Sequence, residues 1–235
     1  MKLYRQDKTV LRVTGAADAL LKGYATNDTD KTETAFVDLK GRIVAIALVR
    51  RLSADDCLLV IGSSYVERLI RHLAKYLPLL GTRIEPDNAY RVYLHLGHGA
   101  EETTETLVIR HRGAETIVTR GEYPADSSKA EYDLYRTSLG LAEQGEDFDE
   151  EMLLNIYDTS HVSYTKGCFL GQEILARVHH RSRPPRRLTV LPCSACAPDI
   201  VAGMTSVAVD PSTGQARGFV FVDQDASAPR IMGPL

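Results

Sequence analysis

The densest group of residues that could do chemistry lies between positions 166 and 177, in the sequence K-G-C-F-L-G-Q-E-I-L-A-R. Gly167 and Gly171 let the backbone turn sharply and approach a ligand closely. We expect a helix to begin near Gly171, and the free backbone N–H groups at a helix start favour an anion. The spacing therefore predicts a ligand-binding turn that leads into a helix.

Cys168 lies just before this expected helix, and Lys166 precedes it by two residues. The positive end of the helix and the ammonium group would both stabilise a thiolate, which is the reactive form of cysteine. We therefore expect Cys168 to be the reactive cysteine of the chain. A Gly-rich turn that merely buries its cysteine is the alternative, and physical chemistry alone leaves it open.

The remaining cysteines point less clearly to a site. Cys193 and Cys196 form a single C-x-x-C pair, which supplies only two of the four ligands of a structural zinc. Pro192 and Pro198 flank the pair, so we expect a loop, with either incidental cysteines or a redox or metal role. Cys57 lies in an apolar run and is expected in the core. We predict no metal site.

Several common site signatures are missing from the sequence. There is no phosphate-binding loop and no H-E-x-x-H pair, and the Gly-His-Gly at 97–99 lacks the third glycine of a dinucleotide loop. Asp158, Ser160 and His161 are close in sequence, but a catalytic triad is defined by geometry, so their proximity predicts nothing.

The net charge of −3 predicts no general attraction to nucleic acid or membranes. The charge is nevertheless uneven, because five arginines crowd into residues 177–187 and an acidic stretch covers residues 143–151. Both runs could simply face solvent. RNA binding by the arginine strip is a third functional hypothesis, but no aromatic residue interleaves with it to stack on bases. We therefore do not expect direct nucleic-acid binding.

The elements that must position these residues are short strands and helices. The pattern predicts strands over 9–14, 34–39, 42–50, 57–61, 82–85, 91–96, 106–110, 115–119, 188–191, 206–209 and 218–222. It predicts helices over 16–23, 64–77, 133–141 and 149–157 and from about 171 to 178. Ser64 and Glu67 are expected to form a capping box at the start of the second helix. Helices scattered among hairpin strands predict an α+β fold with a mostly antiparallel sheet.

The composition fits such a fold. The chain has 235 residues, of which 44% are hydrophobic. Its longest apolar run, over 43–49, is far shorter than the roughly 20 residues of a membrane span. Four cysteines and no visible export signal predict reduced thiols and a cytoplasmic location. The stiff pair at 184–185, Pro-Pro, marks a boundary before a C-terminal β-rich segment.

The motif at 166–177 resembles the K-G-C-[FY]-x-G-Q-E-x-x-A-R motif of YgfZ-type folate-binding proteins, which are relatives of the glycine cleavage T-protein, an aminomethyltransferase. Further similarities are T-N-D at 26–28, F-V-D-L-K-G-R-I-V at 36–44, and R-T-S-L-G at 136–140 followed by the acidic stretch. Together these similarities extend from about residue 10 to 190.

The resemblance implies an antiparallel α+β folate-binding domain over 1–183 and a short β-barrel-like segment over 184–235. It implies tetrahydrofolate, or a one-carbon-substituted folate, as the ligand. It also implies a role in the assembly or maintenance of iron–sulfur proteins, with an effect on tRNA modification and with iron–sulfur client proteins as partners. The functional residues carried over are Cys168 and Lys166 for chemistry, and for folate Asn27, Gly167, Phe169, Gly171, Gln172, Glu173 and Arg177.

Cys168 separates two functions, because aminomethyltransferases typically have an acidic residue at its position. A thiol favours the YgfZ type, whether it attacks a one-carbon adduct of folate or holds iron or a persulfide. The alternative is a folate-dependent one-carbon transferase, which needs a general acid or base; Asp38 and Glu173 are the candidates. Arg177 is expected near the ligand, since arginine pairs well with the carboxylates of a folate tail.

Overall fold

Antiparallel strands and short helices alternate along the chain, as the sequence pattern predicted. The computed structural model describes residues 1–157 and 160–224. In chain order the elements are β1 (Leu3–Arg5), β2 (Lys8–Thr14), α1 (Ala17–Tyr24), β3 (Glu33–Val37), β4 (Ile43–Arg51), β5 (Asp56–Gly62), η1 (Ser63–Tyr65), α2 (Val66–Leu73), α3 (Leu77–Leu80), β6 (Arg83–Pro86), β7 (Arg91–His95), β8 (Thr106–His111), β9 (Ala114–Thr119), α4 (Lys129–Leu139), α5 (Leu153–Ile156), α6 (Gln172–Arg181), β10 (Arg186–Pro192), η2 (Cys193–Ala195), α7 (Pro198–Ala202), β11 (Thr205–Val209) and β12 (Ala216–Asp223).

The central sheet has five strands in the order β3-β4-β5-β2-β6 and is covered on both faces. Successive side chains of a strand point to opposite faces. On β5, Leu59 and Ile61 therefore pack in a cluster with α1 and α2, while Leu58 and Val60 pack against the second sheet. Cys57 is fully buried in the first cluster, as predicted. Burial of both faces explains why the central strands are continuous apolar runs rather than alternating ones.

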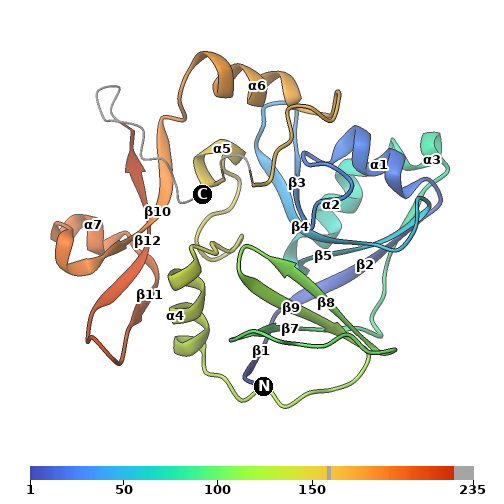
Figure 1. The fold of residues 1–235 in the computed structure, drawn as a ribbon. Coiled ribbons are helices and arrows are strands. Elements are labelled where there is room, and N and C mark those ends of the chain that lie inside the picture. The colour runs from blue at the N-terminus through green and yellow to red at the C-terminus, as the bar shows by residue number, and fades with distance from the viewer. Residues whose placement is uncertain (158–159, 225–235) are drawn as a thin grey trace.

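Two further antiparallel sheets complete the fold, in the orders β1-β7-β9-β8 and β10-β12-β11. The first packs on the central sheet through side chains that include Val92, Ile109 and Val118. The second lies on the other side of α4 and α5 (Figure 1). The separate sheet after residue 185 agrees with the change in composition there, but the division at residue 184 into two domains stays a prediction. Residues 225–235 of the predicted C-terminal segment lie outside the described residues.

A buried arginine joins α4 to this last sheet. Arg136 on α4 lies 2.7 Å from Asp147 and donates a 2.6 Å hydrogen bond to the Ser206 hydroxyl on β11. The hydroxyls of Thr205 and Ser206 donate to the other oxygen of Asp147. The arginine of the R-T-S-L-G segment therefore connects the two parts of the molecule.

The predicted boundaries of three helices are wrong, and one of them is the helix expected over 133–141, which is α4 and begins at Lys129. The helix expected over 64–77 is split into α2 and α3, and no side chain caps α2 because the 3-10 turn η1 occupies the expected capping position. A capping box does form, between Ser128 and Glu131 at the start of α4. The helix expected over 149–157 shrinks to the single turn of α5. The short strand β1 was not predicted.

Candidate functional site

The K-G-C-F-L-G-Q-E motif forms the turn into α6 and packs against the β3–β4 hairpin. Gly171 precedes α6 with a φ of 84°, so the predicted helix start is confirmed. A Cβ atom at Gly171 would lie 2.4 Å from the carbonyl oxygen of Asp38 and 2.8 Å from Cγ2 of Val37. Only glycine fits this close approach. The K-G-C motif and the K-G-R hairpin, which are far apart in sequence, are therefore in direct contact.

Lys166 anchors this turn to α1. Its Nζ donates hydrogen bonds to the carbonyl oxygens of Leu21, at 2.8 Å, and Ala25, at 2.6 Å. These carbonyls lie at the end of a helix, which attracts a cation. Burial lowers the pKa of the Lys166 amine to about 8, and this effect outweighs the charge of Asp28, which raises that pKa. The two hydrogen bonds direct the ammonium toward α1, so a role of Lys166 in activating the Cys168 thiol stays a prediction.

The turn presents Cys168 to solvent. Cys168 is exposed, while the neighbouring Phe169 is buried and its ring lies 5.3 Å from Nζ of Lys166. The backbone N–H of Phe169 donates to Oε1 of Gln172 at 3.3 Å, and that of Leu170 donates to the carbonyl oxygen of Gly23 at 3.0 Å. Phe169 and Gln172, predicted to bind folate, thus fix the turn that follows the accessible thiol.

Asn27 and Thr26 of the T-N-D segment hold a distant loop in place. The Asn27 amide donates to the carbonyl oxygens of Glu33, at 2.8 Å, and Ser160, at 2.9 Å. The Thr26 hydroxyl donates to the carbonyl oxygen of His161. Both threonine and asparagine are buried. The observed role of Asn27 is therefore to position residues 160–161.

Glu173 and Arg177 lie on the outer face of α6. Their side chains are 84% and 59% exposed and form an ion pair of 3.1 Å across one helical turn. Such exposed pairs contribute little to stability. The predicted proximity of Arg177 to a ligand stays a prediction. Asp38, one candidate acid or base, accepts hydrogen bonds from the backbone N–H groups of Lys40 and Arg42 and so shapes the hairpin turn.

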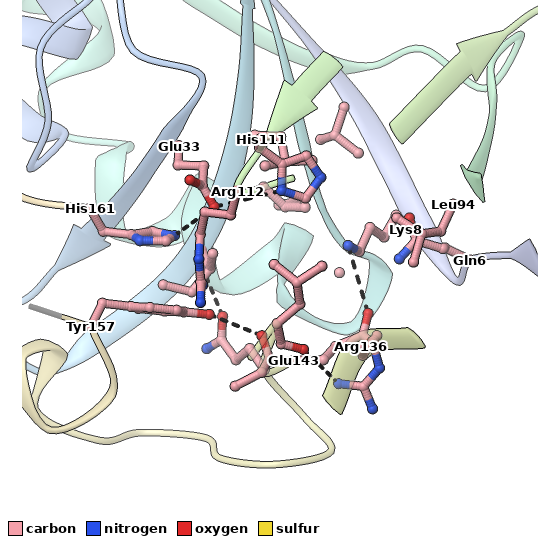
Figure 2. A pocket seen from close by; sticks show the side chains of 18 of the residues that line it. Gln6, Lys8, Glu33, Leu94, His111, Arg112, Arg136, Glu143, Tyr157 and His161 are labelled. Atoms are coloured by element: carbon pink, nitrogen blue, oxygen red, sulfur yellow. Dashed lines mark hydrogen bonds and ion pairs between the residues drawn. The ribbon is translucent and has the colours of Figure 1, made fainter. Parts of the chain in front are cut away.

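A cavity of about 80 Å³ lies elsewhere, between the central sheet, the β8–β9 hairpin and α4 (Figure 2). None of the site residues predicted from the sequence lines it. Its apolar wall includes Ile46, Leu48, Val60 and Leu141. The polar lining residues are Gln6, Lys8, Glu33, His111, Arg112, Tyr132, Arg136, Glu143, Gln144, Tyr157 and His161.

One end of the cavity is built around the Glu33 carboxylate. Oε1 of Glu33 lies 3.6 Å from Nδ1 of His111 and 3.7 Å from Nε2 of His161. Nε2 of His111 lies 2.9 Å from the Thr116 hydroxyl, and Nδ1 of His161 lies 2.9 Å from the Ser160 hydroxyl. Burial alone would raise the pKa of Glu33, but His111, His161 and Arg112 outweigh it and lower that pKa. Glu33 is therefore held as a carboxylate facing the cavity.

Aromatic stacking completes this end. The rings of Tyr157 and His161 are stacked, with centroids 3.8 Å apart and an interplanar angle of 16°. The Arg112 guanidinium lies 5.3 Å from the Tyr157 ring centroid, and Figure 2 shows its side chain between Glu33 and Tyr157. The Tyr157 hydroxyl donates to the carbonyl oxygen of Ala142 at 3.0 Å, and burial raises the pKa of Tyr157. Asp158 lies outside the described residues.

The other end of the cavity carries a network of charges. The Tyr132 hydroxyl donates to Oε2 of Glu143 at 2.6 Å and accepts from the Gln6 amide at 2.9 Å. Nζ of Lys8 lies 3.7 Å from Oε1 of Glu143. Burial lowers the pKa of Lys8, although Glu143 favours its charged form. Arg136 borders this end as well as joining α4 to β11.

Within the part of the chain that the structure describes, three atoms on cavity-lining side chains are buried without a hydrogen-bond partner. They are Oε1 of Gln6, Nδ1 of His111 and Nε of Arg136. Buried polar groups usually find a partner, so each unpaired one calls for an explanation. Nδ1 of His111 faces the Glu33 carboxylate at 3.6 Å and Nε of Arg136 faces Glu143 at 3.9 Å, so Oε1 of Gln6 is the one of the three that faces no charged partner.

The sequence offered little to identify this cavity. Glu33, His111 and His161 are separated by many residues and meet only because β3, β8 and the loop after residue 159 come together. The one local indication of the cavity is the Arg-Gly pair at 112–113. It forms a hairpin turn whose first central position is normally asparagine or glycine.

Among residues 1–157 and 160–224, no group of three or more His, Cys, Asp or Glu side chains could hold a metal ion. Over the same part of the chain, no helix is long and apolar enough to cross a membrane.

The chain is similar to proteins of iron–sulfur cluster assembly. It is 27% identical over 219 residues to the mitochondrial iron-sulfur cluster assembly factor IBA57 of Mus musculus, covering 78% of this chain. It is also 27% identical over 240 residues to that of Homo sapiens, covering 81% of this chain. The alignments span 59% and 67% of these two relatives. No protein-family model matches the sequence.

The fold is that of a solved T-protein. The structure superposes on the glycine cleavage system aminomethyltransferase T of Bartonella henselae with a TM-score of 0.69, at 14% identity, over 94% of this chain and 78% of the other. Such low identity establishes the fold alone. The α+β antiparallel class is confirmed. The IBA57 similarity and the T-protein fold agree with the resemblance to YgfZ-type proteins of the glycine cleavage T-protein superfamily that the sequence motifs indicate.

Proposed function

We propose that this chain acts in iron–sulfur cluster assembly or maintenance and that Cys168 is its acting group. The single observation that carries the proposal is the exposed thiol of Cys168. The turn that carries it is held by the hydrogen bond from Lys166 to α1 and by the buried ring of Phe169. Thiolates bind iron and other soft or borderline metals, and they also carry sulfur as persulfides. The IBA57 names of two relatives support the same process.

The other cysteines are less suited to this role. Cys57 is buried, and burial raises the pKa of its thiol to about 12. Cys193 and Cys196 are only partly exposed, and Sγ of Cys193 lies 3.6 Å from Sδ of Met204. If iron–sulfur proteins are lost, the tRNA modifications that depend on them fall as well. The proposed function therefore affects tRNA without direct contact between this chain and RNA.

We further propose tetrahydrofolate as the ligand of the cavity. The residues present fit its pterin ring: the Glu33 carboxylate can accept from ring N–H groups, and the apolar wall can cover the ring faces. Gln6 supplies a buried unpaired acceptor. The cavity measures about 80 Å³. Ordinary ligand pockets begin at roughly 300 Å³, so side chains must move to admit the ligand. The thiol does not line the cavity, so ligand binding and thiol chemistry are separate functions.

The first proposal is tested in cells depleted of the native protein that instead express this chain. Activity of an iron–sulfur enzyme and the level of an iron–sulfur-dependent tRNA modification are measured with wild type, Cys168→Ser and Cys193→Ser. We expect wild type and Cys193→Ser to restore both readouts and Cys168→Ser to fail at an equal protein level. Full restoration by Cys168→Ser would exclude the thiol from the function.

A further inference from the structure

Arg112 occupies a backbone conformation that arginine rarely adopts. It forms, with Gly113, the two-residue connection of the β8–β9 hairpin, with φ of 44° at Arg112 and 75° at Gly113. Positive φ at both positions is the pattern of a type I′ turn, which favours asparagine or glycine at the first position. A left-handed conformation at a residue with a long side chain costs on the order of 1 kcal/mol or more. Something about the side chain must offset this cost.

The side chain of Arg112 fills the Glu33 end of the cavity. Its guanidinium lies over the Tyr157 ring and donates a 2.5 Å hydrogen bond to the carbonyl oxygen of Gly140. Figure 2 shows it running past Glu33 and His161 toward Tyr157. A flat cation with several N–H donors thus lies between a carboxylate and an aromatic face, which is the surrounding that a guanidinium prefers.

We propose that the Glu33 end of the cavity is a subsite for a flat guanidine-like edge, N–C(NH₂)–N, and that Arg112 fills it from within the chain until a ligand displaces it. The inference rests on the proposed folate function, because the aminopyrimidine ring of a folate carries the same unit of three nitrogens around one carbon. It adds that the chain contains its own competitor for the site.

Four observations support this arrangement. The Glu33 carboxylate is held ionised by His111, His161 and Arg112, while Arg112 donates to the Gly140 carbonyl, so the carboxylate can accept from a ligand. The Tyr157–His161 stack offers a flat surface to both the arginine and a ligand. The Arg112 side chain lines the cavity between Glu33 and Tyr157, so its removal would enlarge the cavity at this end. The hydrogen bond that holds the Arg112 guanidinium goes to one neutral carbonyl oxygen, that of Gly140, and not to the Glu33 carboxylate.

The test uses a small probe that contains only the proposed edge. Isocytosine, 2-aminopyrimidin-4-one, carries the N–C(NH₂)–N unit, and uracil is the matched control in which oxygen replaces the amino group. Binding to the pure full chain is followed by NMR titration with wild type, Arg112→Ala and Arg112→Gly. Glycine accepts the positive φ and keeps the hairpin if alanine perturbs it. Arg110→Ala, which removes a largely exposed arginine of the preceding strand β8, is the control variant.

We expect Arg112→Ala and Arg112→Gly to bind isocytosine at least tenfold more tightly than wild type does. Arg110→Ala should bind it as wild type does, and the Arg112 variants should not bind uracil. Glu33→Gln, combined with either Arg112 substitution, should weaken isocytosine binding at least tenfold. Equal isocytosine affinity in wild type and both Arg112 variants, including no binding in any, would overturn the proposal. Equal binding of uracil and isocytosine would also overturn it.

Titration of the same proteins with tetrahydrofolate separates this inference from the function on which it rests. Isocytosine binding in the Arg112 variants without tetrahydrofolate binding in any protein would refute the folate ligand and leave the guanidine subsite. Tetrahydrofolate binding that Arg112→Gly leaves unchanged, with no gain for isocytosine, would refute the subsite and leave the folate ligand. If both hold, removal of the internal competitor should raise tetrahydrofolate affinity as well.

Discussion

The hydroxyl of Thr26 donates a 2.5 Å hydrogen bond to the carbonyl oxygen of His161. Thr26 lies just after α1 and is fully buried, whereas His161 lies on a loop 135 residues later and faces the cavity. The same hydroxyl accepts from the backbone N–H of Ala35 on β3. One side chain therefore holds the two segments that bring Glu33 and His161 together.

Replacement of Thr26 tests this connection. Thr26→Val keeps the shape of the side chain but leaves a buried carbonyl and a buried N–H unpaired, so we expect a loss of about 1–3 kcal/mol in the free energy of unfolding. Thr26→Ser keeps the hydroxyl and should lose less. Urea denaturation measures both, and equal stability of the two variants would show that the hydroxyl does not hold the loop.

Gly171 and Gly167 give a matched pair of glycine substitutions. Both have positive φ, of 84° and 97°, so alanine strains the backbone at either position. A Cβ at Gly171 would also collide with Asp38, whereas nothing lies within 4 Å of one at Gly167. We expect Gly171→Ala to cost about 1–3 kcal/mol more than Gly167→Ala, the usual cost of overpacking. Thermal unfolding measures the difference. Equal losses would mean that α6 does not pack on the hairpin as described.

The Arg136 network is expected to dominate the stability of the link to the C-terminal sheet. Arg136→Met leaves the buried carboxylate of Asp147 without its cation, whereas Asp133 keeps Lys129 as a partner. Loss of one partner from a buried ion network costs about 3–5 kcal/mol. Arg177→Ala removes an exposed pair and should change the free energy of unfolding by less than about 0.5 kcal/mol. Chemical denaturation of the two variants compares them. Similar losses in both would contradict a central role of Arg136.

The Lys166 amine should titrate near pH 8, because burial disfavours its charged form. Its pKa is thus lower in the folded chain than in the unfolded chain, where it is about 10.4. Between these values the unfolded chain binds the proton that the folded chain has released, so this amine raises the free energy of unfolding as the pH rises from about 8 to 10. NMR of the amine, assigned with Lys166→Met, measures the pKa. Titration at the ordinary lysine value would contradict the described burial.

Local patterns in the sequence predicted the strands well. The runs at 57–61 and 91–96 are β5 and β7 within a residue or two, because β-branched and apolar residues bounded by turn residues leave few alternatives. Helix ends were predicted less well. The S-x-x-E pattern at Ser64 matches a capping box as well as Ser128 does, but Ser64 lies within the 3-10 turn η1 and no side chain caps α2.

The candidate site shows the same limit more strongly. The motif around Cys168 is continuous in sequence, so it could be recognised from its letters alone. The Glu33–His111–His161 cluster has no sequence signature, because its members come from three elements and each is an ordinary residue in its own segment. The residues assigned by resemblance around Cys168 build the motif turn. The residues of the cavity could be identified only from the fold.

Cys168 does not line the cavity that we propose as the folate site. An anaerobic calorimetric titration with tetrahydrofolate of wild type, Cys168→Ser and Glu33→Gln tests whether the thiol and the proposed ligand site are separate. We predict saturable binding that Cys168→Ser leaves unchanged. Glu33→Gln should weaken it by about tenfold or more, the usual effect of losing a buried charged hydrogen-bond acceptor. Absence of binding in wild type, or loss of binding in Cys168→Ser with full affinity in Glu33→Gln, would contradict the separation of cavity and thiol.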